Sequence, residues 1–161
     1  MIHRAFVALG SNLENPQQQV LHALAELDGL PETRVIATSA LYRTAPVGYD
    51  NQPDFINAAV EVSTALPPVA LLRALLALET AQGRERPFPN APRVLDLDLL
   101  MYDDLELHDP ELTLPHPRLH ERAFVLFPLA DIAADMHVPG RGKVSDLLRD
   151  LPDQGVERLA A

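Results

Sequence analysis

Apolar residues recur along the chain with two spacings, and each spacing predicts one kind of element. Residues 4–9 form a short apolar run typical of a buried strand, closed by Gly10-Ser11-Asn12. Residues 34–43 and 94–101 are rich in β-branched or apolar residues and predict two more strands. Residues 55–63 alternate, which predicts a strand with two different faces. One face carries Ile56, Ala58, Val60 and Val62, and the other carries Phe55, Asn57 and Glu61.

Two segments between these strands have helical spacing. Asn15-Pro16 is typical of an N-cap followed by proline at the first helical position, and Gly29 ends that segment. Pro67-Pro68 opens the second helix, and Gly83 is its predicted stop. The second helix is expected to present a broad apolar surface made of Leu71, Leu72, Leu75, Leu76 and Leu78.

The resulting order, β-α-β-β-α-β, is typical of the ferredoxin-like split arrangement. We therefore expect an α+β fold with a four-stranded antiparallel sheet, two helices on one face, and the other face free for a ligand. From about residue 103 the chain has no strand periodicity before a short helix over 144–151. We expect this C-terminal extension to fold back against the sheet. No repeat or linker divides the chain, so residues 1–161 are expected to form one domain.

Composition narrows the class of protein. The chain of 161 residues is 47% hydrophobic and 22% charged, values typical of a globular domain. No apolar run approaches the roughly 18 residues of a membrane span, and residues 5–9 are too short for a secretory signal. We therefore expect a cytoplasmic protein. The absence of cysteine excludes disulfides, thiolate metal sites and a cysteine nucleophile.

The charge distribution points to a small anionic ligand. A formal net charge of −10 disfavours general nucleic-acid binding. Five of the thirteen basic residues nevertheless fall within a stretch of 39 residues: Arg84, Arg86, Arg93, Arg118 and Arg122. Such arginines either bind an anion or are solvated surface charges, and clustering alone does not decide between these readings.

Asp96 and Asp98 are candidate metal ligands. Positions i and i+2 of a strand share a face, so the two carboxylates are expected about 6–7 Å apart, with Leu95, Leu97 and Leu99 facing the core. Two such carboxylates suit a hard divalent cation, and Mg²⁺ beside arginines suits a polyphosphate. The alternative is an ordinary strand with a solvated polar face. The sequence contains neither a P-loop nor a Rossmann glycine motif, which excludes those nucleotide-binding classes.

His116 lies between two prolines, which hold its backbone stiffly beside Arg118 and Arg122. A histidine held in this way can donate to phosphate oxygens. His116 and His120 could alternatively bind zinc, although no third ligand is evident. Phe55, Asn57 and Phe124 could sandwich and read a flat heterocycle, or the phenylalanines could be core residues.

Taken together, these segments resemble the 6-hydroxymethyl-7,8-dihydropterin pyrophosphokinase family of folate biosynthesis. The matching stretches come in the family order and span about residues 5–130. They are residues 8–13 (ALGSNL), 39–46 (SALYRTAP), 52–58 (QPDFINA), Glu79 with 83–86 (GRER), 92–98 (PRVLDLD), 114–116 (LPH) and 122–124 (RAF).

The resemblance implies an ATP- and Mg-dependent diphosphotransferase that moves the β,γ-pyrophosphoryl unit of ATP to the pterin hydroxymethyl oxygen and leaves AMP. It implies that Asp96 and Asp98 hold two Mg²⁺ ions and that Arg84 and Arg93 stabilise charge on the transferred group. We also expect a monomer that binds no nucleic acid or membrane. The implied ATP contacts are Arg86, Leu99, Thr113, His116 and Arg122, and the implied pterin contacts are Thr44, Val47, Phe55, Asn57 and Phe124.

The chain departs from many relatives in the segment at about residues 85–92, which the resemblance implies is a loop that closes over ATP. Pro87 replaces a basic residue, and the chain has no tryptophan at all, so Phe88 is the remaining bulky aromatic there. Two other functions remain open at this point. One is a non-catalytic ligand-binding ferredoxin-like module, and the other is a metal-dependent phosphohydrolase.

Overall fold

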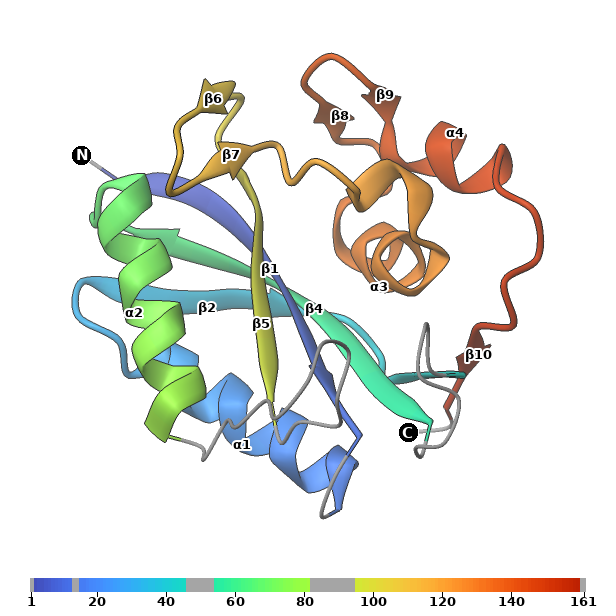
Figure 1. The fold of residues 1–161 in the computed structure, drawn as a ribbon, viewed down its shortest axis with the longest axis horizontal. Coiled ribbons are helices and arrows are strands. Elements are labelled where there is room, and N and C mark those ends of the chain that lie inside the picture. Colours follow the sequence, from blue (N-terminus) through green and yellow to red (C-terminus); the bar gives the residue numbers. More distant parts are fainter. Residues whose placement is uncertain (1, 13–14, 46–53, 82–94, 160–161) are drawn as a thin grey trace.

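The structure is a computed structural model, and it describes residues 2–12, 15–45, 54–81 and 95–159. An antiparallel sheet runs through the molecule (Figure 1). Strand β1 (His3–Ser11) lies between β4 (Phe55–Thr64) and β5 (Asp96–Tyr102). On its other side β4 pairs with β2 (Thr33–Thr38) and β3 (Tyr42–Thr44), and β10 (Glu157–Arg158) pairs with β3. The predicted antiparallel sheet is thus confirmed.

The strand predicted over residues 34–43 is wrong in one respect, because the structure divides it into β2 and β3. Ser39 lies at the break. Its hydroxyl oxygen accepts a hydrogen bond from the backbone N–H of Ala59 at 2.8 Å and donates to the carbonyl of Ala40 at 2.7 Å. The Ser39 side chain thus accepts a backbone N–H that would otherwise bond to a backbone carbonyl of the neighbouring strand. Serine side chains commonly compete with backbone hydrogen bonds in this way.

Helices α1 (Pro16–Asp28) and α2 (Pro68–Ala81) cover one face of the sheet, as predicted (Figure 1). Asn15 precedes α1 with φ of 61° and no side-chain capping bond, so only its place before the helix is confirmed. Leu76 is 42% exposed, so the apolar surface of α2 is narrower than predicted. The predicted stop at Gly83 lies outside the described residues. The core between helices and sheet includes Val7, Leu9, Val20, Leu27, Val60, Leu71, Leu75, Leu97 and Leu99.

A third helix, α3 (Ala123–Ala133), packs on the opposite face, so the expectation that this face is free for a ligand is wrong where α3 lies. Its residues are apolar at nearly every position, which leaves no 3.6-residue stripe for sequence reasoning to detect. Its side chains Leu126 and Leu129 share a second core with Phe6 and Ala59. Only the part of this face beyond α3 remains open.

The remaining elements are short. They are β6 (Leu107–His108) paired with β7 (Thr113–Leu114), the 3₁₀ turn η1 (Leu119–Glu121), β8 (His137–Val138) paired with β9 (Gly142–Lys143), and α4 (Val144–Arg149). The helix predicted over 144–151 is confirmed, although it ends at Arg149. No helix within the described ranges is long and apolar enough to span a membrane.

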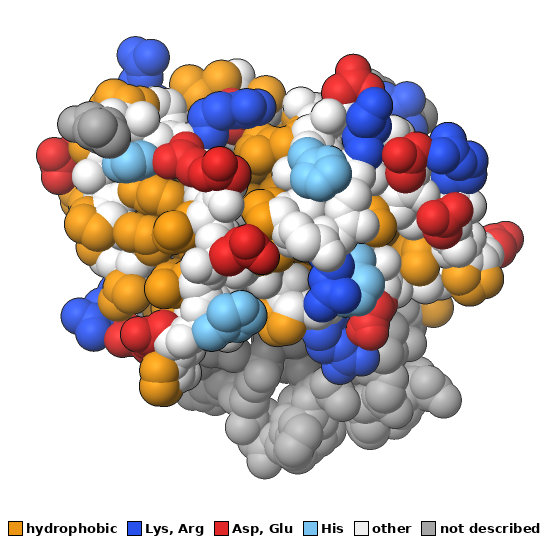
Figure 2. All heavy atoms as spheres, turned by 90° about the horizontal axis from the view of Figure 1, so that it is seen from above, with side chains coloured by type: hydrophobic (Ala, Val, Ile, Leu, Met, Phe, Trp, Pro, Cys, Tyr) orange, Lys and Arg blue, Asp and Glu red, His pale blue; other side chains and the backbone are white. Residues whose placement is uncertain are grey.

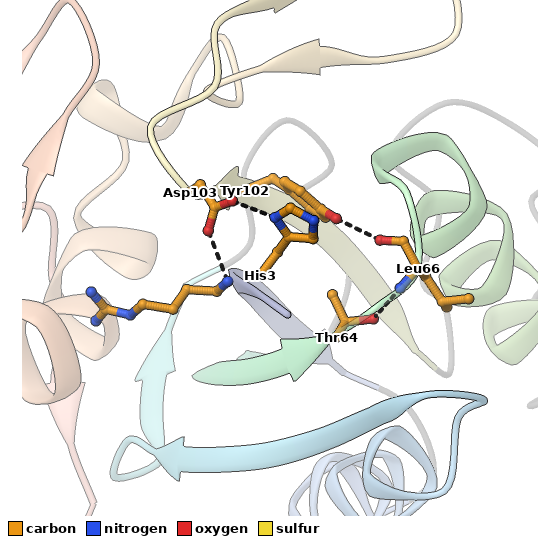
Figure 3. Close-up of polar contacts among 6 residues, drawn as sticks. His3, Thr64, Leu66, Tyr102 and Asp103 are labelled. Carbon is orange, nitrogen blue, oxygen red and sulfur yellow. Dashed lines mark hydrogen bonds and ion pairs between the residues drawn. The ribbon is translucent and has the colours of Figure 1, made fainter. Parts of the chain in front are cut away.

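A set of polar contacts holds the C-terminal end of β5 (Figure 3). The Asp103 carboxylate is paired with His3 Nδ1 at 2.6 Å and accepts the backbone N–H of Arg4 at 2.9 Å. The Tyr102 hydroxyl donates to the carbonyl of Leu66 at 2.6 Å. These contacts tie β5 to β1 and to the segment before α2, so the strand that begins with Asp96 is anchored at its far end.

Candidate functional site

A cavity of about 370 Å³ lies over the part of the sheet that α3 leaves open. The sheet, the segment from η1 into α3, and the C-terminal segment all contribute to it. The lining residues are Ala8, Leu9, Gly10, Thr44, Ala45, Phe55, Asn57, Asp96, Asp98, Arg118, Glu121, Arg122, Phe124, Val125 and Gln154.

The strand register explains why the floor is hollow. Gly10 of β1 is paired with Asn57 on one side and with Asp96 on the other. Ala8 similarly lies between Ala59 and Asp98. Neighbouring strands are about 4.8 Å apart, so Asn57 and Asp96 are separated by roughly 10 Å across two strand spacings. The two polar residues therefore lie on opposite sides of a floor with almost no side chain.

The Asn57 side chain leaves little space for any side chain at position 10. A Cβ atom at this position would lie 3.1 Å from the Asn57 Oδ1 and 3.9 Å from Cδ1 of Phe55. The first distance is shorter than a normal van der Waals contact. Glycine at this position therefore leaves the Asn57 amide and the Phe55 ring undisturbed.

Asn57 is held in one orientation. Its Nδ2 donates to the Thr44 hydroxyl at 2.9 Å, and the two residues are only 5% and 6% exposed. Since one amide hydrogen is used in this bond, the remaining amide hydrogen and the oxygen can serve a ligand in the cavity. Phe55, Phe124 and Thr44, all predicted as pterin contacts, line the same cavity.

The predicted alternation of β5 is confirmed. Asp96 and Asp98 are half-buried and line the cavity, whereas Leu97 and Leu99 are buried in the core on the opposite face. The backbone N–H of Leu97, between the two aspartates, donates to Oε2 of Glu79 at 2.6 Å. Glu79 is 2% exposed on α2, and an acidic residue on an apolar helix face is the sequence signal that marks it.

The donor set fits a magnesium ion shared with a phosphate substrate. Mg²⁺ prefers oxygen ligands, and it is usually held by one or two carboxylates together with substrate phosphates and water. Asp96 and Asp98 supply two carboxylates facing one cavity. Within the described part of the chain, no group of three or more histidine and acidic side chains could hold a metal, so a zinc site at His116 and His120 gains no third ligand.

His116 is a neutral hydrogen-bond donor. Burial lowers its pKa to about 4, and the positive charges of Arg122 and Arg118 act in the same direction against a smaller opposing effect of Asp96. The backbone N–H of Arg118 donates to Nδ1 at 3.2 Å, which leaves the ring proton on Nε2. The backbone N–H of His116 donates to the carbonyl of Leu100 at 2.8 Å and so ties this residue to β5.

Arg118 and Arg122, which follow His116 in sequence, line the cavity, whereas His116 itself is not among its lining residues. The guanidinium carbon of Arg122 lies 5.6 Å from the centroid of the Phe124 ring, a cation–π arrangement. Arg118 is 4.0 Å from the Glu121 carboxylate. Figure 2 shows acidic and basic side chains interspersed over the face that it presents.

The structure does not bring every predicted residue into the cavity. Arg84, Arg86, Arg93 and Val47 lie outside the described residues, as does the segment 85–92. The Leu99 side chain is 3% exposed in the core, and Thr113 is paired with His108 in the β6–β7 hairpin. Neither of these two lines the cavity.

Several lining residues were missed by sequence reasoning. Arg118 and Glu121 follow His116 closely in sequence, but neither has a predicted role in binding. Gln154 comes from a C-terminal segment that carries no motif, so no local signal marks it.

Comparison with known proteins gives consistent matches. The family model described as 7,8-dihydro-6-hydroxymethylpterin-pyrophosphokinase (HPPK) matches residues 6–134. A Pseudomonas aeruginosa protein named 2-amino-4-hydroxy-6-hydroxymethyldihydropteridine pyrophosphokinase is 46% identical over 99% of this chain and 98% of its own length. The Haemophilus influenzae protein of the same name is 37% identical over 96% of this chain and 97% of its own length.

Solved structures share the fold. A crystal structure of an HPPK-DHPS in complex with substrates superposes with a TM-score of 0.77 at 13% identity. The match covers 99% of this chain and 47% of that one. The wild-type HPPK-DHPS of Plasmodium falciparum gives a TM-score of 0.69 at 16% identity, over 91% of this chain and 43% of that one. The chain therefore spans less than half the length of these proteins.

Proposed function

This chain belongs to the 7,8-dihydro-6-hydroxymethylpterin-pyrophosphokinase family, and on that basis we propose the reaction that its cavity carries out. It transfers pyrophosphate from ATP to the hydroxymethyl group of 6-hydroxymethyl-7,8-dihydropterin. The products are AMP and the pterin diphosphate, in folate biosynthesis. The observation that supports this most directly is the pairing of Gly10 with Asn57 on one neighbouring strand and with Asp96 on the other. This pairing puts an oriented amide and a carboxylate in one cavity.

The Asn57 side of the cavity is proposed to bind the pterin. The Asn57 amide, oriented by Thr44, can pair with the edge of a flat heterocycle. Phe55 and Phe124 supply aromatic rings for stacking. The Arg122 guanidinium lies over the Phe124 ring. Backbone groups around Thr44 and Val47 are proposed to complete this recognition.

The Asp96 side is proposed to bind the triphosphate. Asp96 and Asp98 would hold two Mg²⁺ ions, which would supply positive charge against the phosphate oxygens of ATP. Arg84 and Arg93 stabilise charge on the transferred group, and Arg86, His116 and Arg122 are further ATP contacts. Leu99 and Thr113 are also proposed ATP contacts. The buried side chain of Leu99 leaves only its backbone for that role.

Catalysis in this arrangement is mainly positioning. The hydroxymethyl oxygen attacks the β-phosphorus, and the bond from the β-phosphorus to the oxygen shared with the α-phosphorus breaks. The cavity residues hold the two substrates in line, which is the main contribution that proteins make to phosphoryl transfer. His116 is uncharged at neutral pH, so it can donate its Nε2 hydrogen to a phosphate oxygen without adding a charge.

Several wider features are also part of the proposal. The strand order β2/β3, β4, β1, β5, with α1 and α2 on one face, supports a ferredoxin-like core extended at its C-terminus by α3, α4 and β10. We further propose that residues 1–161 act as one catalytic domain, as a monomer in the cytoplasm.

The decisive experiment measures AMP release from ATP and Mg²⁺ with and without hydroxymethyl-dihydropterin. We expect AMP and the pterin diphosphate only when the pterin is present. AMP and free pyrophosphate without pterin would instead indicate a phosphohydrolase, and ligand binding without AMP would indicate a non-catalytic module. Asp98→Ala should abolish the signal, whereas Asp104→Ala, an exposed carboxylate beyond the other end of β5, should preserve it.

A further inference from the structure

We infer that Gln154 is a positioning residue that sets the backbone on either side of Arg122, and this inference rests on the proposed function. Gln154 lines the cavity, yet it comes from the C-terminal segment, far in sequence from every residue assigned a role above.

Both polar groups of the Gln154 amide bind main chain. Its Nε2 donates to the carbonyl of Glu121 at 3.1 Å, and its Oε1 accepts the backbone N–H of Ala123 at 2.9 Å. The two partners are the immediate neighbours of Arg122. One glutamine side chain therefore holds both peptide groups that flank a proposed ATP contact.

The held segment has main-chain bonds of its own at Arg122, whose N–H donates to the carbonyl of Leu119 at 3.4 Å and whose carbonyl accepts the N–H groups of Val125 and Leu126 at 3.0 Å. None of these bonds uses the Glu121 carbonyl or the Ala123 N–H, the two groups that Gln154 binds. Arg122 is extended, with φ of −113° and ψ of 105°, between the turn η1 and helix α3. It precedes α3 without a side-chain capping bond, and the first N–H groups of a helix have no acceptor within the helix. Gln154 supplies an acceptor to Ala123, the first residue of α3, from 31 positions away.

The same C-terminal segment is attached to the opposite wall of the cavity. Just beyond Gln154, β10 pairs with β3, where Glu157 is opposite Arg43. The backbone N–H of Leu159 donates to the carbonyl of Leu41 at 2.9 Å. Strand β3 ends at Thr44, which orients Asn57. Residues 154–159 thus join the strand behind the pterin amide to the segment that carries Arg122 and Phe124.

This arrangement predicts a loss of turnover in a protein that still folds. Gln154 is exposed, so removal of its side chain leaves no buried cavity. Without it, the chain between η1 and α3 has more freedom, and Arg122 and Phe124 are less often in the binding geometry. Two hydrogen bonds of an exposed side chain, each at the low end of the usual range, together correspond to about 1–1.4 kcal/mol, a loss of roughly five- to tenfold.

The test compares Gln154→Ala with Gln154→Glu and with Asp153→Ala in the full chain. Gln154→Glu keeps an acceptor for Ala123 but not the donor to Glu121. Asp153→Ala removes only a local bond, from the N–H of Gly155 to the Asp153 carboxylate at 2.8 Å. We expect Gln154→Ala to lower kcat/KM for the pterin about five- to tenfold. Loss of these two bonds should lower its Tm by only about 2–5 °C, so the protein remains folded at the assay temperature. Asp153→Ala should keep wild-type turnover.

Amide hydrogen exchange provides a readout that is independent of turnover. Exchange at Ala123 should accelerate in Gln154→Ala and stay slow in Gln154→Glu and Asp153→Ala. Unchanged exchange at Ala123, or unchanged turnover in Gln154→Ala, overturns the inference. If the wild-type protein forms no AMP with ATP, Mg²⁺ and pterin, the proposed function fails, and the exchange result alone decides whether Gln154 holds this segment.

Discussion

Replacement of Gly10 by alanine tests the geometry of the cavity floor with a single methyl group. The added Cβ would lie 3.1 Å from the Asn57 Oδ1, so the amide must move by a few tenths of an ångström. Asn57 cannot move freely, because its Nδ2 is bonded to the Thr44 hydroxyl at 2.9 Å and the pair is buried. The substitution therefore forces Asn57 out of the orientation proposed to pair with the pterin.

The magnitude follows from the groups affected. A displaced amide that leaves buried polar groups poorly paired costs about 1–3 kcal/mol, which corresponds to roughly a 5- to 150-fold loss of pterin affinity. Folding should change much less. Gly10 does not have the left-handed conformation that disfavours alanine, and Gly→Ala stabilises by about 0.4–1 kcal/mol through the unfolded chain. This gain offsets much of the crowding at Asn57.

Calorimetric titration of Gly10→Ala with the pterin, and separately with an ATP analogue and Mg²⁺, measures both affinities. Gly29→Ala is the matched control, because its Cβ would meet only the Glu26 carbonyl at 3.5 Å, away from the cavity. Asn57→Ala should weaken pterin binding to a similar extent. Since Gly10 acts through Asn57, the two effects should not add in the double variant. Wild-type pterin affinity in Gly10→Ala, or a larger loss for the nucleotide, would refute this reasoning.

Three further predictions concern the nucleotide side. Asp98→Ala should abolish Mg²⁺-dependent AMP formation. Circular dichroism and Tm should show an intact fold, because Asp98 lines the cavity and is not part of the core. Near-normal AMP formation would contradict the metal assignment. Arg93→Ala should lower kcat more than ATP affinity, since an interaction that strengthens in the transition state appears in kcat; an unchanged chemical step in single-turnover kinetics would make Arg93 a binding residue only. Burial lowers the pKa of His116 from 6.5 to about 4, so the stability that the neutral ring contributes is complete above pH 6.5 and is lost as the pH falls towards 4. Between pH 7 and 4.5, wild-type unfolding free energy should therefore fall about 1 kcal/mol further than that of His116→Gln, after allowance for solvent screening. Urea titrations of both proteins at the two pH values measure this difference. An equal fall in unfolding free energy for wild type and His116→Gln would show that His116 is not buried as a neutral group.

Local sequence determined most of the sheet and the two helices on its first face. Strand β5 illustrates why: side chains alternate across a strand, so Asp96 and Asp98 had to share a face opposite Leu97 and Leu99, whichever strands lay beside them. Helices α1 and α2 could also be predicted from the sequence, because their apolar residues recur with helical spacing and a proline marks each start.

Other features exist only in the tertiary structure. Helix α3 is apolar almost all round, and what it packs against depends on the second face of the sheet. The distance between Asn57 and Asp96 depends on the register of both strands with Gly10, which no local pattern encodes. The bonds of Gln154 to Glu121 and Ala123 span more than thirty residues, and β10, which follows Gln154, pairs with β3 from the far side of the chain. Chemistry carried by residue type and local spacing was therefore predictable, whereas the positions of these residues relative to one another were set by long-range pairing.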